Sequence, residues 1–281
     1  MKKEQPQDRR SKVVAVLRSA SPCSYRTLTH QAQRLLGSMC GEEQLQQILQ
    51  EVVEERMMLC STSQGQPDVL VAKASKIARD LYYVPQAGKA ARLNWADGSC
   101  SEMVDVPEAY TKLLRSDLEE ARTKLQALMD KYAQDFPEAV AVVFQDVRTR
   151  AGLVICVYKL KKNPRQMVCS SWKSVWNVCL GEDGTTGRLT GTVENDVFHF
   201  EDCEIRHQCT LDYSRDLHFQ STEELVSGTH AAIVDFEDAH ASKSESLLSS
   251  TFLDVLQSLR RTLPIGKQKF EWDVHCDPIN K

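Results

Sequence analysis

Two histidines and two cysteines lie within eleven residues of each other, and these are side chains that zinc prefers. They are His199, Cys203, His207 and Cys209. The segment around them alternates like a β-strand, with positions 203, 205, 207, 209 and 211 on one face. Residues four apart on a strand are separated by about 13 Å, so side chains on one face cannot converge on zinc bonds of about 2.0–2.3 Å. We therefore expect a half-buried strand face here and no metal site.

Two other catalytic patterns are incomplete or missing. The loop at 181–187 reads Gly-Glu-Asp-Gly-Thr-Thr-Gly, but it has no lysine and carries two carboxylates that would repel phosphate. A hairpin loop is the better interpretation. The sequence has no Gly-x-Ser-x-Gly motif. We expect no enzymatic activity and no cofactor, and one alternative stays open: a cytosolic thiol- or metal-dependent enzyme that uses the Cys/His-rich strand.

Positive charge gathers near the C-terminus. Apolar residues recur there at three- and four-residue spacing and predict a helix that ends before Pro264; they are Phe252, Val255, Leu256, Leu259 and Leu263. Arg260 and Arg261 lie in its last turn, and Lys267 and Lys269 follow. Two arginines at a helix end can simply stabilise that end. In an acidic protein, a basic segment of this length also fits an acidic partner.

The composition excludes several classes of protein. With 281 residues and 42% hydrophobic content, the chain can bury a substantial core. A net charge of −4 and a pI near 6.0 argue against a general nucleic-acid binder. The first twelve residues are polar and no apolar run is long enough for a membrane span, so we expect a cytoplasmic protein whose ten cysteines are free thiols.

The sequence patterns of helices and strands along the chain predict an α+β fold. Residues 1–60 read as a helical bundle, and residues 61–105 as a small β module of short apolar pieces separated by turn residues. A helix over 106–132 then precedes five strand candidates at 140–147, 152–160, 171–180, 187–201 and 203–211. Turn signals between these strands, rather than helices, predict an antiparallel meander.

A long helix over 222–263 follows the predicted sheet and covers it. The expected division is therefore 1–60 helical bundle, 61–105 small β module, 106–221 helix plus antiparallel sheet, 222–263 long helix and 264–281 basic C-terminal tail. The serine-rich stretch at 240–250 is a plausible place for a kink in the helix.

Three segments together resemble the F-actin capping protein alpha subunit family. Residues 259–264 read Leu-Arg-Arg-Thr-Leu-Pro, and a basic, apolar stretch ending at Trp272 follows them. Residues 172–176 fit a Trp-x-Ser-x-Trp strand, and residues 197–202 are similar to the family's Val-His-Tyr-Tyr-Glu-Asp sequence. The family has a glycine where this chain has Cys203, a lysine where it has Gln257, and a further amphipathic helix beyond the tail.

The resemblance implies the alpha subunit of a heterodimer that caps the barbed end of the actin filament. The partners would be a capping protein beta subunit and the filament end, and capping would work by occupancy alone. The implied actin-binding residues are Arg260, Arg261, Leu263, Lys267, Lys269 and Trp272. A related alternative keeps the fold and caps an actin-like filament in another assembly. Because the chain after Trp272 is short, we expect the binding residues to lie before it.

Overall fold

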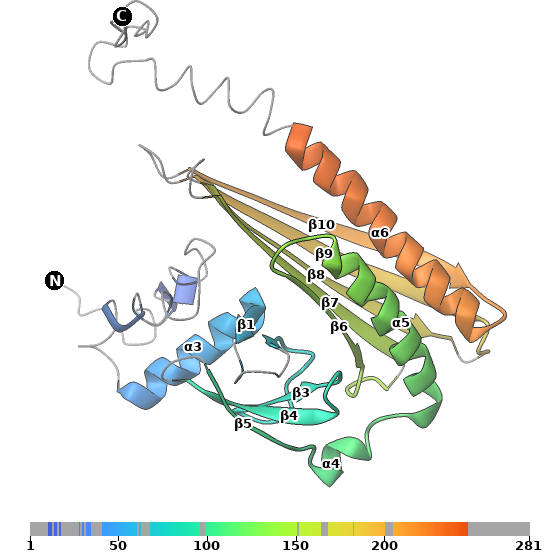
Figure 1. The fold of residues 1–281 in the computed structure, drawn as a ribbon, viewed down its shortest axis with the longest axis horizontal. Helices are drawn as coiled ribbons and strands as arrows, with labels where there is room; N and C mark the ends of the chain where they lie inside the picture. The colour runs from blue at the N-terminus through green and yellow to red at the C-terminus, as the bar shows by residue number, and fades with distance from the viewer. Residues whose placement is uncertain are drawn as a thin grey trace, which may run out of the picture. The chain divides into compact units, whose positions relative to one another are not determined.

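The computed structural model describes residues 41–246, except 61, 63–67, 96–98, 151, 164–167, 182 and 200–204, together with scattered positions between 11 and 34. The chain divides into two compact units, Met1–His230 and Ala231–Lys281. Figure 1 follows the chain through these elements. The fold is α+β, with a helix and two small sheets followed by a five-stranded antiparallel sheet and a long helix.

The first fully described helix is α3 (Glu42–Arg56). Glu42 and Glu43 lie in its first turn and Arg56 in its last, so the charges at both ends oppose the helix dipole. Its apolar face, which includes Leu49 and Val52, belongs to a core cluster that also contains side chains of the small sheets. The predicted bundle is described only by α3 and a few earlier helical residues, so the rest of it lies outside the described residues.

The predicted small β module consists of two separate sheets. β1 (Met58–Cys60) pairs with β2 (Val69–Val71), and β3 (Leu81–Val84), β4 (Lys89–Asn94) and β5 (Ser99–Asp105) form a separate three-stranded sheet. Both sheets are antiparallel, as expected for short strands joined by turns.

The helix predicted over 106–132 is broken in two, which corrects the sequence interpretation. α4 (Glu108–Thr111) is a single turn, and α5 (Ser116–Gln134) follows it. At the break, the Gln145 side chain accepts a hydrogen bond from the Arg115 backbone N–H at 2.7 Å and donates one to the Arg115 carbonyl at 3.0 Å. A side chain from the sheet thus satisfies backbone groups that a continuous helix would have bonded internally.

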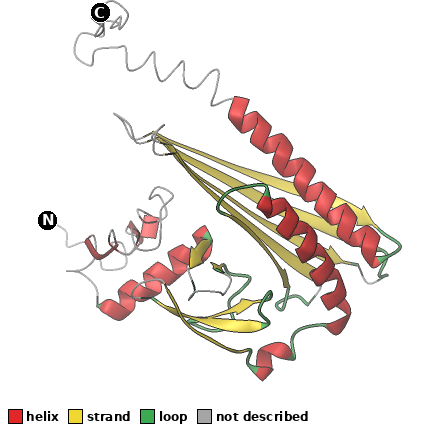
Figure 2. Cartoon of the chain, in the orientation of Figure 1, coloured by secondary structure: helices red, strands yellow, loops and turns green. Residues whose placement is uncertain are grey.

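The predicted meander is confirmed. Its strands are β6 (Ala139–Gln145), β7 (Gly152–Asn163), β8 (Val168–Leu180), β9 (Thr186–His199) and β10 (Ile205–His218). Their order in the sheet is β10-β9-β8-β7-β6, so each strand pairs with its neighbours in sequence, and all pairs are antiparallel. Figure 2 shows the long central strands of this sheet in yellow. β6 and β10 are its two edges.

One close contact in this sheet depends on a glycine. Trp176 of β8 is fully buried and pairs across the strands with Gly191 of β9. A Cβ atom at Gly191 would lie 2.1 Å from Cε3 of the Trp176 ring. The ring also meets Tyr213 of β10 edge-on, with 5.6 Å between centroids. The indole can therefore approach β9 this closely only because position 191 has no side chain.

The last described helix, α6 (Thr222–Ser246), begins with a capping arrangement. Ser221 Oγ accepts a hydrogen bond from the Glu224 N–H, and the Glu224 carboxylate accepts one from the Gln220 N–H at 2.7 Å. The helix was predicted to run over 222–263; it is described to Ser246, and the remainder lies outside the described residues. None of the described helices is long and apolar enough to cross a membrane.

Candidate functional site

The six residues that the sequence assigns to actin binding all lie outside the described residues. These are Arg260, Arg261, Leu263, Lys267, Lys269 and Trp272. Their assignment stays a prediction, as does the division of the chain into five segments. The described residues carry other candidate features: a cysteine- and histidine-rich strand, a charged cavity, a buried carboxylate and the two edges of the large sheet.

The cysteine- and histidine-rich strand has the alternation expected of it. His207 and Cys209 of β10 are half-buried, whereas their neighbour Gln208 is exposed. Cys203 lies outside the described residues. Within the described ranges, no three His, Cys, Asp or Glu residues are grouped so that they could hold a metal ion.

Two buried thiols are poor nucleophiles. Burial raises the pKa of the Cys60 thiol to about 12, with a further contribution from nearby Cys100. Burial alone raises the pKa of Cys156 to about 12. Because the thiolate is the reactive form, both groups are almost fully protonated and unreactive at neutral pH.

A cavity of about 420 Å³ opens beside one face of β8, β9 and β10. Its charged lining residues are three acids and three bases, namely Glu55, Glu194, Asp196, Arg56, Lys173 and Arg206. Arg206 donates two hydrogen bonds to the Asp196 carboxylate, at 2.7 and 2.6 Å, and Lys173 lies 2.7 Å from Glu194. Arg206 and Lys173 already have carboxylate partners, and the lining carries as many acids as bases, so the cavity is not suited to binding an anion.

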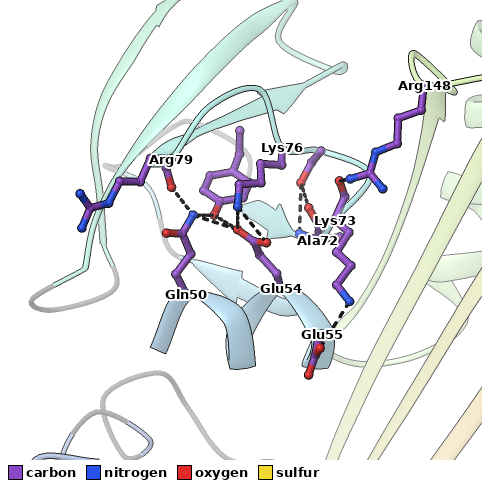
Figure 3. A network of polar contacts seen from close by, with 10 residues as sticks. Gln50, Glu54, Glu55, Ala72, Lys73, Lys76, Arg79 and Arg148 are labelled. Carbon is purple, nitrogen blue, oxygen red and sulfur yellow. Dashed lines mark hydrogen bonds and ion pairs between the residues drawn. The ribbon is translucent and has the colours of Figure 1, made fainter. Parts of the chain in front are cut away.

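The buried carboxylate of Glu54 joins α3 to the small sheets. It accepts a hydrogen bond from the Tyr82 hydroxyl at 2.6 Å and from Gln50 Nε2 at 2.9 Å, and it forms an ion pair with Lys76 at 2.8 Å. Burial, followed by the bond to Glu54, raises the pKa of Tyr82 well above its usual value. Figure 3 shows this network, in which Gln50 also donates to the backbone carbonyl of Arg79. The arrangement is saturated by its own residues, which indicates a structural role.

Further polar contacts join this region to the five-stranded sheet. Lys73 pairs with Glu55 of α3 at 3.4 Å, and Arg148, between β6 and β7, donates to the Lys73 carbonyl at 3.4 Å (Figure 3). Lys173 of β8 donates to the Glu55 carbonyl at 3.1 Å. The small sheets and the large sheet are thus held together by polar contacts as well as by a shared apolar cluster.

The β6 edge of the large sheet is occupied by a side chain from α5. Gln126 Nε2 donates to the Ala141 carbonyl at 2.9 Å, and Gln126 Oε1 accepts from the Val143 N–H at 2.7 Å. Nothing in the sequence around Gln126 points to this contact, because a glutamine on a helix is usually a solvated residue. The sequence interpretation missed it.

The β10 edge has a different character. β10 pairs with β9 over fourteen residues, from Ile205 to His218. No further described strand pairs with its other side, so this edge is long, and the residues of one strand face, such as Cys209, Leu211 and Tyr213, are only half-buried. A long edge with partly exposed apolar side chains is typical of a surface that another chain covers.

Comparison with known proteins points to one family. Residues 13–277 match the sequence model of the F-actin capping protein alpha subunit. The chain is 21% identical over 235 residues to the F-actin-capping protein subunit alpha of Arabidopsis thaliana, covering 79% of this chain and 74% of that protein. It is 23% identical over 271 residues to the Dictyostelium discoideum protein of the same name, covering 91% and 90%.

A solved structure has the same fold. It is the homodimeric actin capping protein alpha subunit from Plasmodium berghei, which is similar to this chain with a TM-score of 0.70 and 19% sequence identity. The alignment covers 93% of this chain and 99% of that one. The fold of this chain therefore recurs in a second protein.

Proposed function

Because the chain belongs to the F-actin capping protein alpha subunit family, we propose that it acts as one subunit of a dimer that binds the barbed end of an actin filament. The observation that carries this proposal is the family match over residues 13–277, which includes the tail segment and the whole meander. Bound at the filament end, the dimer blocks both addition and loss of actin subunits by occupancy. The protein would then work in the cytoplasm, on the cytoskeleton.

This function requires no chemical step. The family consists of filament-capping subunits, so the expectation that the chain is not an enzyme follows from its membership. Affinity must come from a wide contact surface with a few strong residues at its centre. The inert thiols Cys60 and Cys156 are consistent with that role, since neither has a reactive thiolate at neutral pH.

We propose a beta subunit as the partner in the dimer. The β10 edge supports this, because no further described strand pairs with it and its half-buried side chains offer a surface for a second sheet. The Plasmodium berghei relative is described as homodimeric, which makes a second copy of this chain the competing partner. Native mass spectrometry of the protein purified from its own cells distinguishes the two: a heterodimer gives two different subunit masses, whereas a homodimer gives one.

We propose that Arg260, Arg261, Leu263, Lys267, Lys269 and Trp272 contact actin. Support comes from their agreement with the family's Leu-Arg-Arg-x-Leu-Pro segment and from the general fit of a basic segment to an acidic surface. Two deletions test where the contact ends: one removes residues 273–281, and the other removes everything after Leu263. We expect the short deletion to leave the off-rate of the cap nearly unchanged and the long one to raise it. Equal effects of both deletions would place an essential contact in the last nine residues.

The direct test of the function is elongation of actin from filament seeds in the presence of the purified dimer. We expect the dimer to stop growth at barbed ends, with half-maximal effect far below the actin concentration. Growth from seeds whose barbed ends are already blocked by another capper is the control and should not change. If barbed-end growth continues at all dimer concentrations, the proposal fails for actin, and an actin-like filament becomes the substrate to test.

A further inference from the structure

The β6 strand could pair with a strand of another molecule if its edge were open. Its sequence, Ala-Val-Ala-Val-Val-Phe-Gln, is apolar, uncharged and rich in β-branched residues. Uncharged segments of this kind readily add to an identical strand from another molecule. Lysine, proline or a bulge often prevents such pairing in natural sheets. β6 has no lysine and no proline, and its unbroken register with β7 leaves no bulge.

The pairing with β7 determines which backbone groups of β6 point outward. The Asp146 N–H bonds to the Gly152 carbonyl at 3.0 Å, and the Leu160 N–H bonds to the Glu138 carbonyl at 3.2 Å, one contact at each end of the strand. In an antiparallel pair, residues that bond to the neighbour alternate with residues that do not. The even-numbered residues of β6 therefore bond to β7, and positions 139, 141, 143 and 145 direct their N–H and C=O groups to the free edge.

Gln126 occupies the middle of that edge. Its amide donates to the Ala141 carbonyl and accepts from the Val143 N–H, which are successive outward-facing positions. The second Nε2 proton is donated to Asp130 Oδ1 at 2.7 Å, one helical turn further along α5. The Asp130 carboxylate thus fixes which end of the amide faces Ala141. Gln126 as a whole is only 7% exposed, so the contact is shielded from water.

We propose that Gln126 takes the place of a neighbouring strand and closes the β6 edge, so that the sheet can be extended only at β10. Gln126 thereby determines the specificity of assembly. It prevents the β6 strand of a second copy from pairing with β6 of the first. A subunit with two open edges could add partners on both sides and would not form a closed dimer. This inference goes beyond filament capping, since it rests on the hydrogen bonds of β6 and not on any contact with actin.

The test uses the full chain, purified as the dimer, with Gln126→Met. Methionine nearly conserves the volume of glutamine but has no amide, so the packing of α5 is kept while both backbone contacts are lost. We expect the Val143 N–H to exchange with solvent at least about tenfold faster, as loss of a buried hydrogen bond implies. Light scattering after gel filtration should detect species larger than the dimer whose share rises with protein concentration.

Gln134→Met is the matched control, because Gln134 lies on the same helix but is exposed. It should change neither the exchange of Val143 nor the size of the assembly. Unchanged exchange of Val143 in Gln126→Met would overturn the assigned contact. Faster exchange without larger species would overturn the role in assembly.

A measurement on the unmodified dimer keeps the proposal testable if Gln126→Met does not fold. The N–H groups of Val143 and Ala139 both face the free edge, but only that of Val143 donates to Gln126. We expect Val143 to exchange at least about tenfold more slowly than Ala139. Equal rates would refute the proposal. Capping of actin is a separate readout, and its loss or retention would not bear on this result.

Discussion

Replacing Tyr82 with phenylalanine should weaken the junction between α3 and the small sheets. The Tyr82 hydroxyl lies 2.6 Å from Glu54 Oε1, and a hydrogen bond to a charged partner contributes about 1.5–3 kcal/mol. Glu54 would keep its contacts with Lys76 and Gln50 and would not be left without a partner. We therefore expect a loss near the lower end of that range, about 1.5–2 kcal/mol in the free energy of unfolding.

The pH dependence supplies a second, independent signature. Because burial and the bond to Glu54 raise the pKa of Tyr82, the folded protein keeps this hydroxyl protonated when the unfolded chain has begun to lose its proton. The resulting stabilisation is complete below the unfolded pKa of about 10 and is lost as the pH rises above it. Tyr82→Phe removes this contribution, so its stability should fall less steeply above about pH 10 than that of the unmodified protein.

Urea denaturation of the dimer at one fixed protein concentration measures both effects. Tyr83→Phe is the matched control: Tyr83 is the next residue of β3 and is also buried, but its hydroxyl makes no hydrogen bond to another described residue. Phenylalanine keeps the ring and removes no such hydrogen bond, so this variant should lose clearly less stability than Tyr82→Phe. If both variants lose the same stability, or if the alkaline fall in stability is as steep in Tyr82→Phe as in the unmodified protein, the assigned role of Glu54 is wrong.

Three further substitutions have defined outcomes. Gly191→Ala should destabilise the protein by about 1–3 kcal/mol, because the new methyl group meets the Trp176 ring, and a thermal melt measures the loss. Gly228 lies in the interior of α6, and a Cβ atom there would meet no other atom within 4 Å. Gly228→Ala should therefore stabilise the protein by about 0.5–1 kcal/mol. A change of the same sign in both variants would contradict the close approach of Trp176 to Gly191. Arg260→Glu combined with Arg261→Glu should weaken capping while the dimer stays intact, and the difference should shrink as salt screens the charges. Seeded elongation at two salt concentrations checks the last, and unchanged capping would remove these arginines from the binding surface.

The sequence was informative about the meander because every strand in it pairs with the next one along the chain. Alternation and turn signals between neighbours are local, and they identified all five strands. The ends of the strands were less accurate. β10 continues to His218, well beyond the predicted end at residue 211. The prediction ended too early because the polar residues on the solvent-facing side of the strand resemble turn residues. Asp212 in fact accepts a hydrogen bond from Thr192, and Asp216 pairs with Arg188, so both stabilise the strand pair.

Contacts between distant side chains and backbone were beyond the reach of sequence patterns. The apolar spacing of 106–132 fits one helix, whereas the backbone of Arg115 at the break bonds to Gln145, which lies 30 residues later. The role of Gln126 at the β6 edge is hidden for the same reason. Periodicity predicts which face of a helix is buried, but not which polar side chain on that face reaches the edge of a sheet. The family resemblance supplied the function, because the tail motif is local and could be recognised without the fold.

The order of strands in the large sheet has a consequence for how the chain folds. Each β-hairpin of the meander closes a short loop, so the sheet can grow hairpin by hairpin with little loss of chain entropy at each step. The contacts that attach α3 and the small sheets to it span far more of the chain: Arg148 and Lys73 are 75 residues apart, and Lys173 and Glu55 are 118 apart. Because closing such long loops costs chain entropy, we expect these contacts to form after the sheet. On this expectation, the segment 42–105 of a newly made chain stays unattached until the sheet, which follows it in the sequence, has been synthesised.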